Sequence, residues 1–202
     1  MLAEVAGQME IVPGDTGRRF LLLSNTHGGK GSVVVKFTAV RVVCQNTLML
    51  SMEDGEPMLR LRHSRNLVPR LDEVQGLIAT ANQVYHDATE LFVAMAKRTL
   101  RSADLDQFLD LVYPRTKEQR EKGVELSGSK AVHRLMQECP DLQLNGIRGS
   151  LWAAYNAITR AVDHEGSMRS GPEARLERIW FGDGAELKRR ALERAREWIG
   201  SN

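Results

Sequence analysis

Basic residues without acidic neighbours form the part of this sequence best suited to chemistry. The stretch from Arg18 to Met52 contains no Asp or Glu, and a second basic group follows the acidic turn at residues 53–57. Lys and Arg bind phosphate groups through charge, and the glycine-rich segment 26–31 could add backbone amides. The sequence therefore predicts nucleic-acid contacts at seven residues: Lys30, Lys36, Arg41, Arg60, Arg62, His63 and Arg65.

The same cations have a second interpretation. A sheet face in contact with water carries charged side chains because they discourage edge-to-edge association with other sheets. The residues would then bind no ligand at all. The two interpretations differ in whether the cationic side chains converge in space or are scattered.

Other residues with reactive side chains form no recognised catalytic or metal-binding motif. Cys44 could act as a nucleophile with His27 or His63 as its base, and Asp163 with His164 could serve in acid/base chemistry. The apolar run before Cys44 favours a buried structural cysteine instead. The sequence therefore predicts no catalytic residue, no metal and no cofactor, and it favours a non-catalytic protein. A hydrolase that uses Cys44 or His164 is the alternative.

Strands are predicted to position the cations. Residues 20–23 and 32–43 are apolar and rich in β-branched side chains, and the glycine-rich segment between them is typical of a hairpin. Residues 58–63 alternate apolar and basic side chains with the period of two expected for a half-exposed strand. Capping residues before a short apolar run predict a helix at residues 47–52.

The chain becomes helical after Pro69. Apolar residues recur every three or four positions over residues 70–100, which predicts one amphipathic helix of about 45 Å. Further helices are predicted over residues 102–112, 132–138 and 151–162, and over the tail 173–199, where Gly182-Asp183-Gly184 breaks the pattern. The predicted fold class is α+β, a small antiparallel sheet backed by the long helix, with a mainly helical C-terminal half. We expect a single domain over residues 1–202, mostly strands in 1–69 and mostly helical in 70–202.

Composition places the protein among ordinary globular chains. It has 202 residues, 42% of them hydrophobic, and a formal net charge of +2, so no global basic field marks it as a nucleic-acid binder. Its two cysteines lie far apart in sequence, which is not the pattern of a disulfide scaffold. No apolar stretch is long enough for a signal sequence or a membrane span, so we expect a cytoplasmic protein without a membrane partner.

Several longer segments resemble the phage/plasmid-like protein family built on a domain of unknown function. The resemblance covers nearly the whole chain from Phe20 onward, and it rests on the segments FLLLSNTHGG at 20–29, RVVCQNTL at 41–48, LWAAYNAITRAVDH at 151–164 and RLERIWFGDGAELKRRAL at 175–192. Two features depart from the family pattern. Gly28 stands where family members carry an Asp after the histidine, and those members have a longer region before the strands.

The resemblance implies that the protein is encoded on a mobile element of a bacterial host, and it implies no settled activity. It also suggests a distant similarity to phage single-strand annealing proteins, which hold nucleic acid between a sheet and a long helix. We therefore expect a DNA-binding or recombination-associated protein that binds single-stranded DNA, as a homo-oligomer, on converging cations. The alternative is a protein-interaction module whose cationic face meets an acidic host or phage factor.

Overall fold

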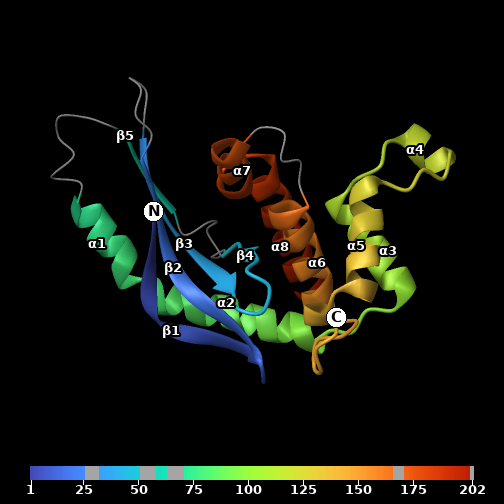
Figure 1. Cartoon of the computed structure of the whole chain (residues 1–202), viewed down its shortest axis with the longest axis horizontal. Helices are drawn as coiled ribbons and strands as arrows, with labels where there is room; N and C mark the ends of the chain where they lie inside the picture. The colour runs from blue at the N-terminus through green and yellow to red at the C-terminus, as the bar shows by residue number, and fades with distance from the viewer. Residues whose placement is uncertain (26–31, 51–57, 63–70, 166–170, 201–202) are drawn as a thin grey trace. The chain divides into compact units, whose positions relative to one another are not determined.

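The computed structural model of the chain describes residues 1–25, 32–50, 58–62, 71–165 and 171–200 (Figure 1). These residues form two compact units, Met1–Glu90 and Leu91–Asn202, which we call the sheet unit and the helical unit. The first unit holds an antiparallel sheet together with the helical segment from residue 71 to residue 90, and the second unit is helical. The predicted α+β class is therefore confirmed.

The sheet is an antiparallel meander. Its strands are β1 (Leu2–Val12), β2 (Asp15–Asn25), β3 (Ser32–Arg41), β4 (Thr47–Leu48) and β5 (Met58–Arg62). They follow the order β1-β2-β3-β4, and β5 also pairs with β3. The predicted β2–β3 hairpin is confirmed by nine pairs from Gly17↔Arg41 to Asn25↔Val33. Strand β1 was not predicted, because most of its side chains are exposed and its sequence has no strong apolar alternation.

The predicted helix at residues 47–52 is wrong where the structure describes it. Thr47 and Leu48 form β4 and pair with Val40 and Ala39 of β3. The carbonyl of Leu48 accepts a hydrogen bond of 3.0 Å from the hydroxyl of Thr38. A short run of buried apolar residues is compatible with a strand as well as with a helix, and here pairing with β3 selects the strand.

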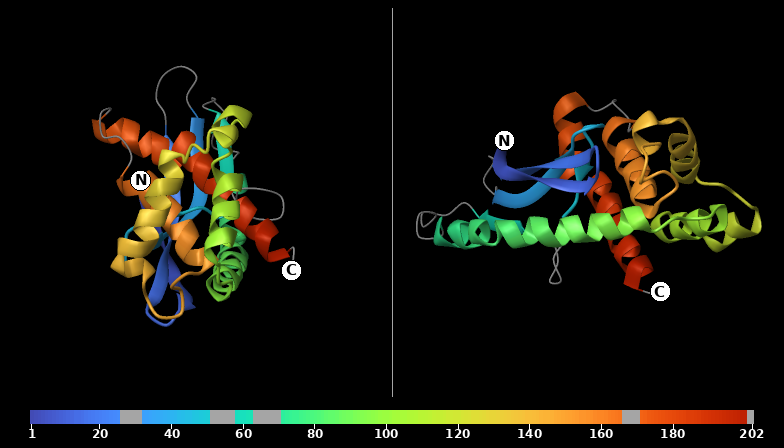
Figure 2. Two further views of the ribbon diagram at one scale, coloured as in Figure 1. Left: turned by 90° about the vertical axis from the view of Figure 1, so that its right-hand side faces the viewer. Right: turned by 90° about the horizontal axis from the view of Figure 1, so that it is seen from below.

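The single long helix predicted for residues 70–100 is two helices, α1 (Leu71–Ala79) and α2 (Ala81–Lys97), which follow one another in Figure 2. Thr80 separates the two helices. Its hydroxyl and its amide both donate to the carbonyl of Leu77, at 2.7 and 3.1 Å. A threonine side chain that bonds to the backbone in this way competes with the regular helical ladder, which accounts for the break.

Helix α2 covers one face of the sheet through Tyr85. The Tyr85 hydroxyl lies 2.7 Å from the carbonyl oxygen of Phe20 and 3.2 Å from that of Thr38, so it can donate to either strand. Its ring meets Phe37 edge-on, with centroids 5.5 Å apart, and the guanidinium of Arg19 lies 5.2 Å from its centre. Because side chains alternate across a strand, Lys36 lies on the face of β3 opposite to Phe37.

The helical unit is built around α6. Its helices are α3 (Ser102–Val112), α4 (Lys117–Glu121), α5 (Ser127–Glu138), the 3-10 helix η2 (Pro140–Leu142), α6 (Leu151–His164), α7 (Gly171–Trp180) and α8 (Asp183–Gly200). Helix α6 is buried on nearly all sides, and its Trp152 ring lies 4.6 Å from that of Phe92. Near its C-terminal end, Lys188 of α8 and Asp163 form a buried ion pair of 2.9 Å. In the described residues, no helix combines the length and hydropathy needed to cross a membrane.

Candidate nucleic-acid interface

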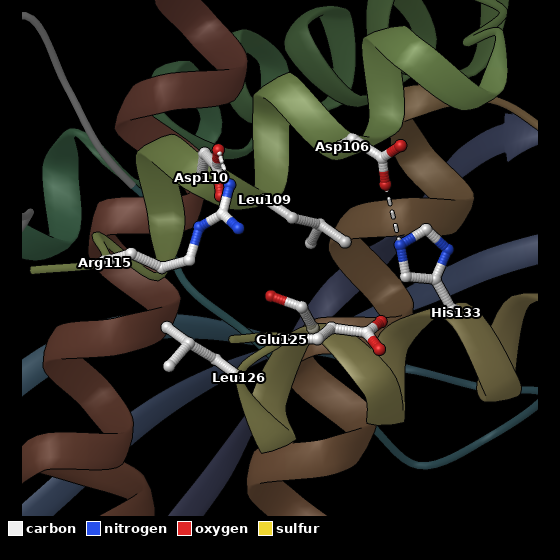
Figure 3. Close-up of a pocket in the computed structure, with 8 residues that line it drawn as sticks. Asp106, Leu109, Asp110, Arg115, Glu125, Leu126 and His133 are labelled. Carbon is white, nitrogen blue, oxygen red and sulfur yellow. Dashed lines mark hydrogen bonds and ion pairs between the residues drawn. The ribbon is translucent and has the colours of Figure 1, made fainter. Parts of the chain in front are cut away.

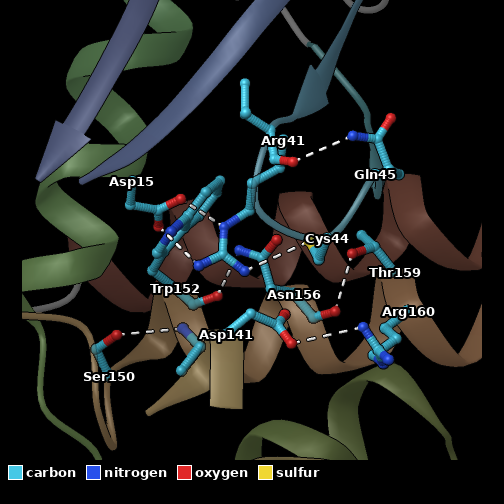
Figure 4. A network of polar contacts seen from close by, with 12 residues as sticks. Asp15, Arg41, Cys44, Gln45, Asp141, Ser150, Trp152, Asn156, Thr159 and Arg160 are labelled. Atoms are coloured by element: carbon cyan, nitrogen blue, oxygen red, sulfur yellow. Dashed lines mark hydrogen bonds and ion pairs between the residues drawn. The ribbon is translucent and has the colours of Figure 1, made fainter. Parts of the chain in front are cut away.

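Arg41 is not available to a nucleic acid. Its side chain and that of Asp15 have no exposed surface, and Arg41 donates to both carboxylate oxygens of Asp15, at 2.6 and 2.9 Å (Figure 4). A further contact of 3.5 Å joins Arg41 to the sulfur of Cys44. Burial lowers the pKa of Arg41, but Asp15 and Cys44 raise it by more, so the buried group stays charged. The prediction of a nucleic-acid contact at Arg41 is wrong because a carboxylate already neutralises it.

Lys36 is also enclosed, with 4% of its surface exposed. The strand register places it between Leu22 of β2 and Met58 of β5. Arg41 lies an odd number of residues further along the same strand, so the two side chains point to opposite faces of the sheet. The prediction that these cations share one open positive face is therefore wrong for Lys36 and Arg41.

Arg60 is the predicted residue that remains accessible. It is exposed, it pairs with Val34 across the β3–β5 ladder, and it forms no ion pair with any other residue that the structure describes. The backbone of Arg62 lies two residues further along β5, opposite Ser32. The other three predicted contacts, Lys30, His63 and Arg65, lie outside the described residues.

Acidic residues from outside the acid-free stretch compensate much of the charge in the sheet unit. Arg18 donates to Glu4 of β1 with a 2.8 Å hydrogen bond, and both side chains are about half exposed. Arg19 donates to the backbone carbonyl of Gln8 at 3.0 Å. Residues 1–90 contain nine Lys and Arg and ten Asp and Glu, so the unit as a whole carries no positive excess.

The burial and partners of the candidate catalytic residues indicate structural roles. Cys44 is buried beside Arg41, and the histidines proposed as its base, His27 and His63, lie outside the described residues. Asp163 is buried and pairs with Lys188, while the neighbouring His164 is exposed. Among the described residues, no group of three or more His, Cys, Asp or Glu could hold a metal ion.

A cavity of about 300 Å³ in the helical unit has charged walls (Figure 3). Two of its carboxylates are paired, since Asp106 lies 3.0 Å from His133 and Asp110 lies 2.6 Å from Arg115. A third, Glu125, has the ammonium of Lys130 at 3.9 Å. The lining therefore has three carboxylates against one arginine and one histidine, which makes it unsuited to a phosphate group.

Comparison with known proteins yields one match. The family described as "Domain of unknown function (DUF932)" matches residues 1–180. No curated protein and no solved structure matches the chain.

Proposed function

Because the chain belongs to the DUF932 family, whose function is unknown, we propose a function from its charges: it binds single-stranded DNA through the phosphate backbone and catalyses no reaction itself. In keeping with the resemblance to phage/plasmid-like proteins, it would act as a homo-oligomer in recombination of a mobile element. Its place of action would be the cytoplasm of the bacterial host.

The observation that carries this proposal is the exposed guanidinium of Arg60. Strand β5 runs Met58-Leu59-Arg60-Leu61-Arg62, and its arginines recur every second residue along a strand that, among the described residues, pairs with β3. Residues two apart in a strand share a face and lie about 6.6 Å from one another. A flexible single strand can follow such a row with consecutive phosphates, whereas a rigid duplex fits it less easily.

Electrostatic binding of this kind has a measurable signature. Each phosphate neutralised on a single strand contributes about 0.7 to the slope of log affinity against log salt. With this slope, a fall in salt from about 1 M to about 50 mM strengthens binding about eightfold for each contact. Loss of two such contacts would weaken binding about 60-fold at the lower salt concentration.

The test is fluorescence anisotropy of a labelled single-stranded oligonucleotide at two salt concentrations. The variant Arg60→Ala with Arg62→Ala should bind much more weakly than the unchanged protein at low salt and show a shallower salt slope. The matched control removes two other exposed cations, Lys117 and Arg120 of α4, and should bind normally. If the unchanged protein shows no binding at low salt, the proposal fails.

A protein-interaction module is the second candidate. The turn after β3 exposes Val42 and Val43, which keep 39% and 41% of their surface accessible. Exposed apolar side chains next to one another favour contact with a protein more than with a phosphate backbone. Capture of a partner from nuclease-treated lysate, combined with absence of oligonucleotide binding, would favour this candidate over DNA binding.

A further inference from the structure

Four cations of the helical unit lie where two distant segments meet. Thr99 and Ser150 form an isolated antiparallel bridge. Beside it, the amide of Leu100 donates to the carbonyl of Gly149 at 2.9 Å, and the amide of Leu151 donates to that of Arg98 at 2.8 Å. We call the basic residues of these two segments the cationic corner. They are Lys97, Arg98, Arg101 and Arg148.

The charges of the cationic corner are largely uncompensated. Lys97 and Arg148 are exposed, and neither forms an ion pair with another described residue. Arg98 is half-buried, and its Nε makes no hydrogen bond within the described part of the chain. Arg101 is paired, at 2.9 Å, with Asp104. Four cations therefore share one carboxylate, whereas most other cations of the helical unit have an acidic partner.

Backbone dipoles add to this positive potential. Helix α3 begins at Ser102 and helix α6 at Leu151, so both N-terminal ends lie next to the bridge. The N-terminal end of a helix carries a partial positive charge that acts over its first turn. Asp104 lies in the first turn of α3, and hydrogen bonds from Arg101, with the nearby charge of Arg98, lower its pKa to about 2. This shift comes chiefly from the side-chain and backbone hydrogen bonds of Arg101, and the charge of Arg98 makes a smaller contribution.

A cavity with Arg148 in its wall adjoins the corner. It has a volume of about 350 Å³, and its walls are Met136, Gln137, Gln143, Arg148 and Gly149. Among the residues that the structure describes, no acidic side chain lines it. Amide side chains can both donate to and accept from the edge of a base, and an arginine plane can stack on its face. A nucleotide whose phosphate lies on the corner could therefore place its base or sugar here.

We infer that the cationic corner binds the phosphate backbone of a single nucleic-acid strand, with a base or sugar in the cavity beside Arg148. The inference rests on the proposed function only for its choice of ligand. The site lies in the helical unit, which carries nineteen Lys and Arg against sixteen Asp and Glu over residues 91–202. The positive excess of the chain thus resides in this unit and not in the sheet unit.

The test compares three double variants of the full-length chain with a labelled oligothymidylate of about 20 nucleotides. Lys97→Ala with Arg148→Ala removes two exposed cations of the corner. Arg60→Ala with Arg62→Ala removes the pair on β5, and the control removes the two exposed cations of α4. All three variants lower the net charge equally, so a difference between them reports on location. Circular dichroism establishes that each variant is folded.

The corner variant is expected to bind about 60-fold more weakly at about 50 mM salt and to lose about 1.4 from the salt slope. Normal binding by the β5 variant together with weak binding by the corner variant supports the corner and refutes the role of Arg60. The reverse pattern overturns the corner and leaves the proposed function standing. Equal affinity of the corner and control variants overturns the corner, and absence of binding by the unchanged protein overturns both proposals.

Discussion

Replacement of Asp15 by Asn tests whether Arg41 is held as a buried ion. Asn preserves the shape of the side chain but removes the negative charge that faces the guanidinium. In the folded protein both side chains are fully enclosed, and two hydrogen bonds join them. After the change, a permanently charged arginine would remain buried without its carboxylate.

The expected loss of unfolding free energy follows from the cost of an uncompensated buried charge. Breaking a buried ion pair by removing one partner destabilises a protein by about 3–5 kcal/mol. A typical domain has an unfolding free energy of about 5–15 kcal/mol, so the change should remove about a fifth or more of it. The pair of Arg18 and Glu4 provides a matched control in the same sheet, because its side chains are half exposed. Glu4→Gln should cost much less, because water screens the exposed charges of this pair.

The assay is equilibrium unfolding in urea followed by far-ultraviolet circular dichroism. Hydrogen exchange at the amides of β2 and β3 then assigns the loss to the sheet unit. Asp15→Asn is expected to lower the unfolding free energy by several kcal/mol more than Glu4→Gln does. Equal effects of the two substitutions would refute this expectation, because they would mean that Arg41 does not depend on Asp15.

Two further predictions concern the helical unit. Arg101→Ala should raise the pKa of Asp104 from about 2 towards 3.8, because the carboxylate loses its main hydrogen-bond donor. Titration of the side chain followed by nuclear magnetic resonance measures this pKa. An unchanged titration midpoint would contradict the prediction. The contribution of this carboxylate to stability is present above its unfolded-state pKa and disappears as the pH falls towards 2, so the variant should differ least at the acid end. Gly128→Ala should destabilise the unit by about 1–3 kcal/mol, because the added carbon would lie 2.4 Å from the ring of Tyr113. In the control Gly76→Ala in α1, the added carbon has no atom within 4 Å, so the change should leave thermal stability unaltered or raise it. Equal losses of stability at the two glycines would contradict the clash with Tyr113.

The sequence by itself determined where most of the regular structure lies. Strand β3 is a nearly continuous β-branched run, β5 alternates apolar and basic residues, and α6 is apolar on almost every side. These signals are local, since each depends on residues a few positions apart. Local signals could not identify β1, whose pairing with β2 supplies most of its stabilisation, or the break at Thr80, where one hydroxyl bond alters a regular pattern.

The location of free positive charge was decided only by the tertiary structure. Along the chain, residues 18–52 look like the basic region, yet the β1–β2 hairpin brings Glu4 onto Arg18, and Arg41 is buried in an ion pair with Asp15. Lys97 and Arg148 attract no notice in the sequence, because about fifty residues separate them and the bridge between Thr99 and Ser150 brings their segments together. The physical reason is that compensation of a charge depends on partners within a few ångströms, and distance along the chain does not measure this separation.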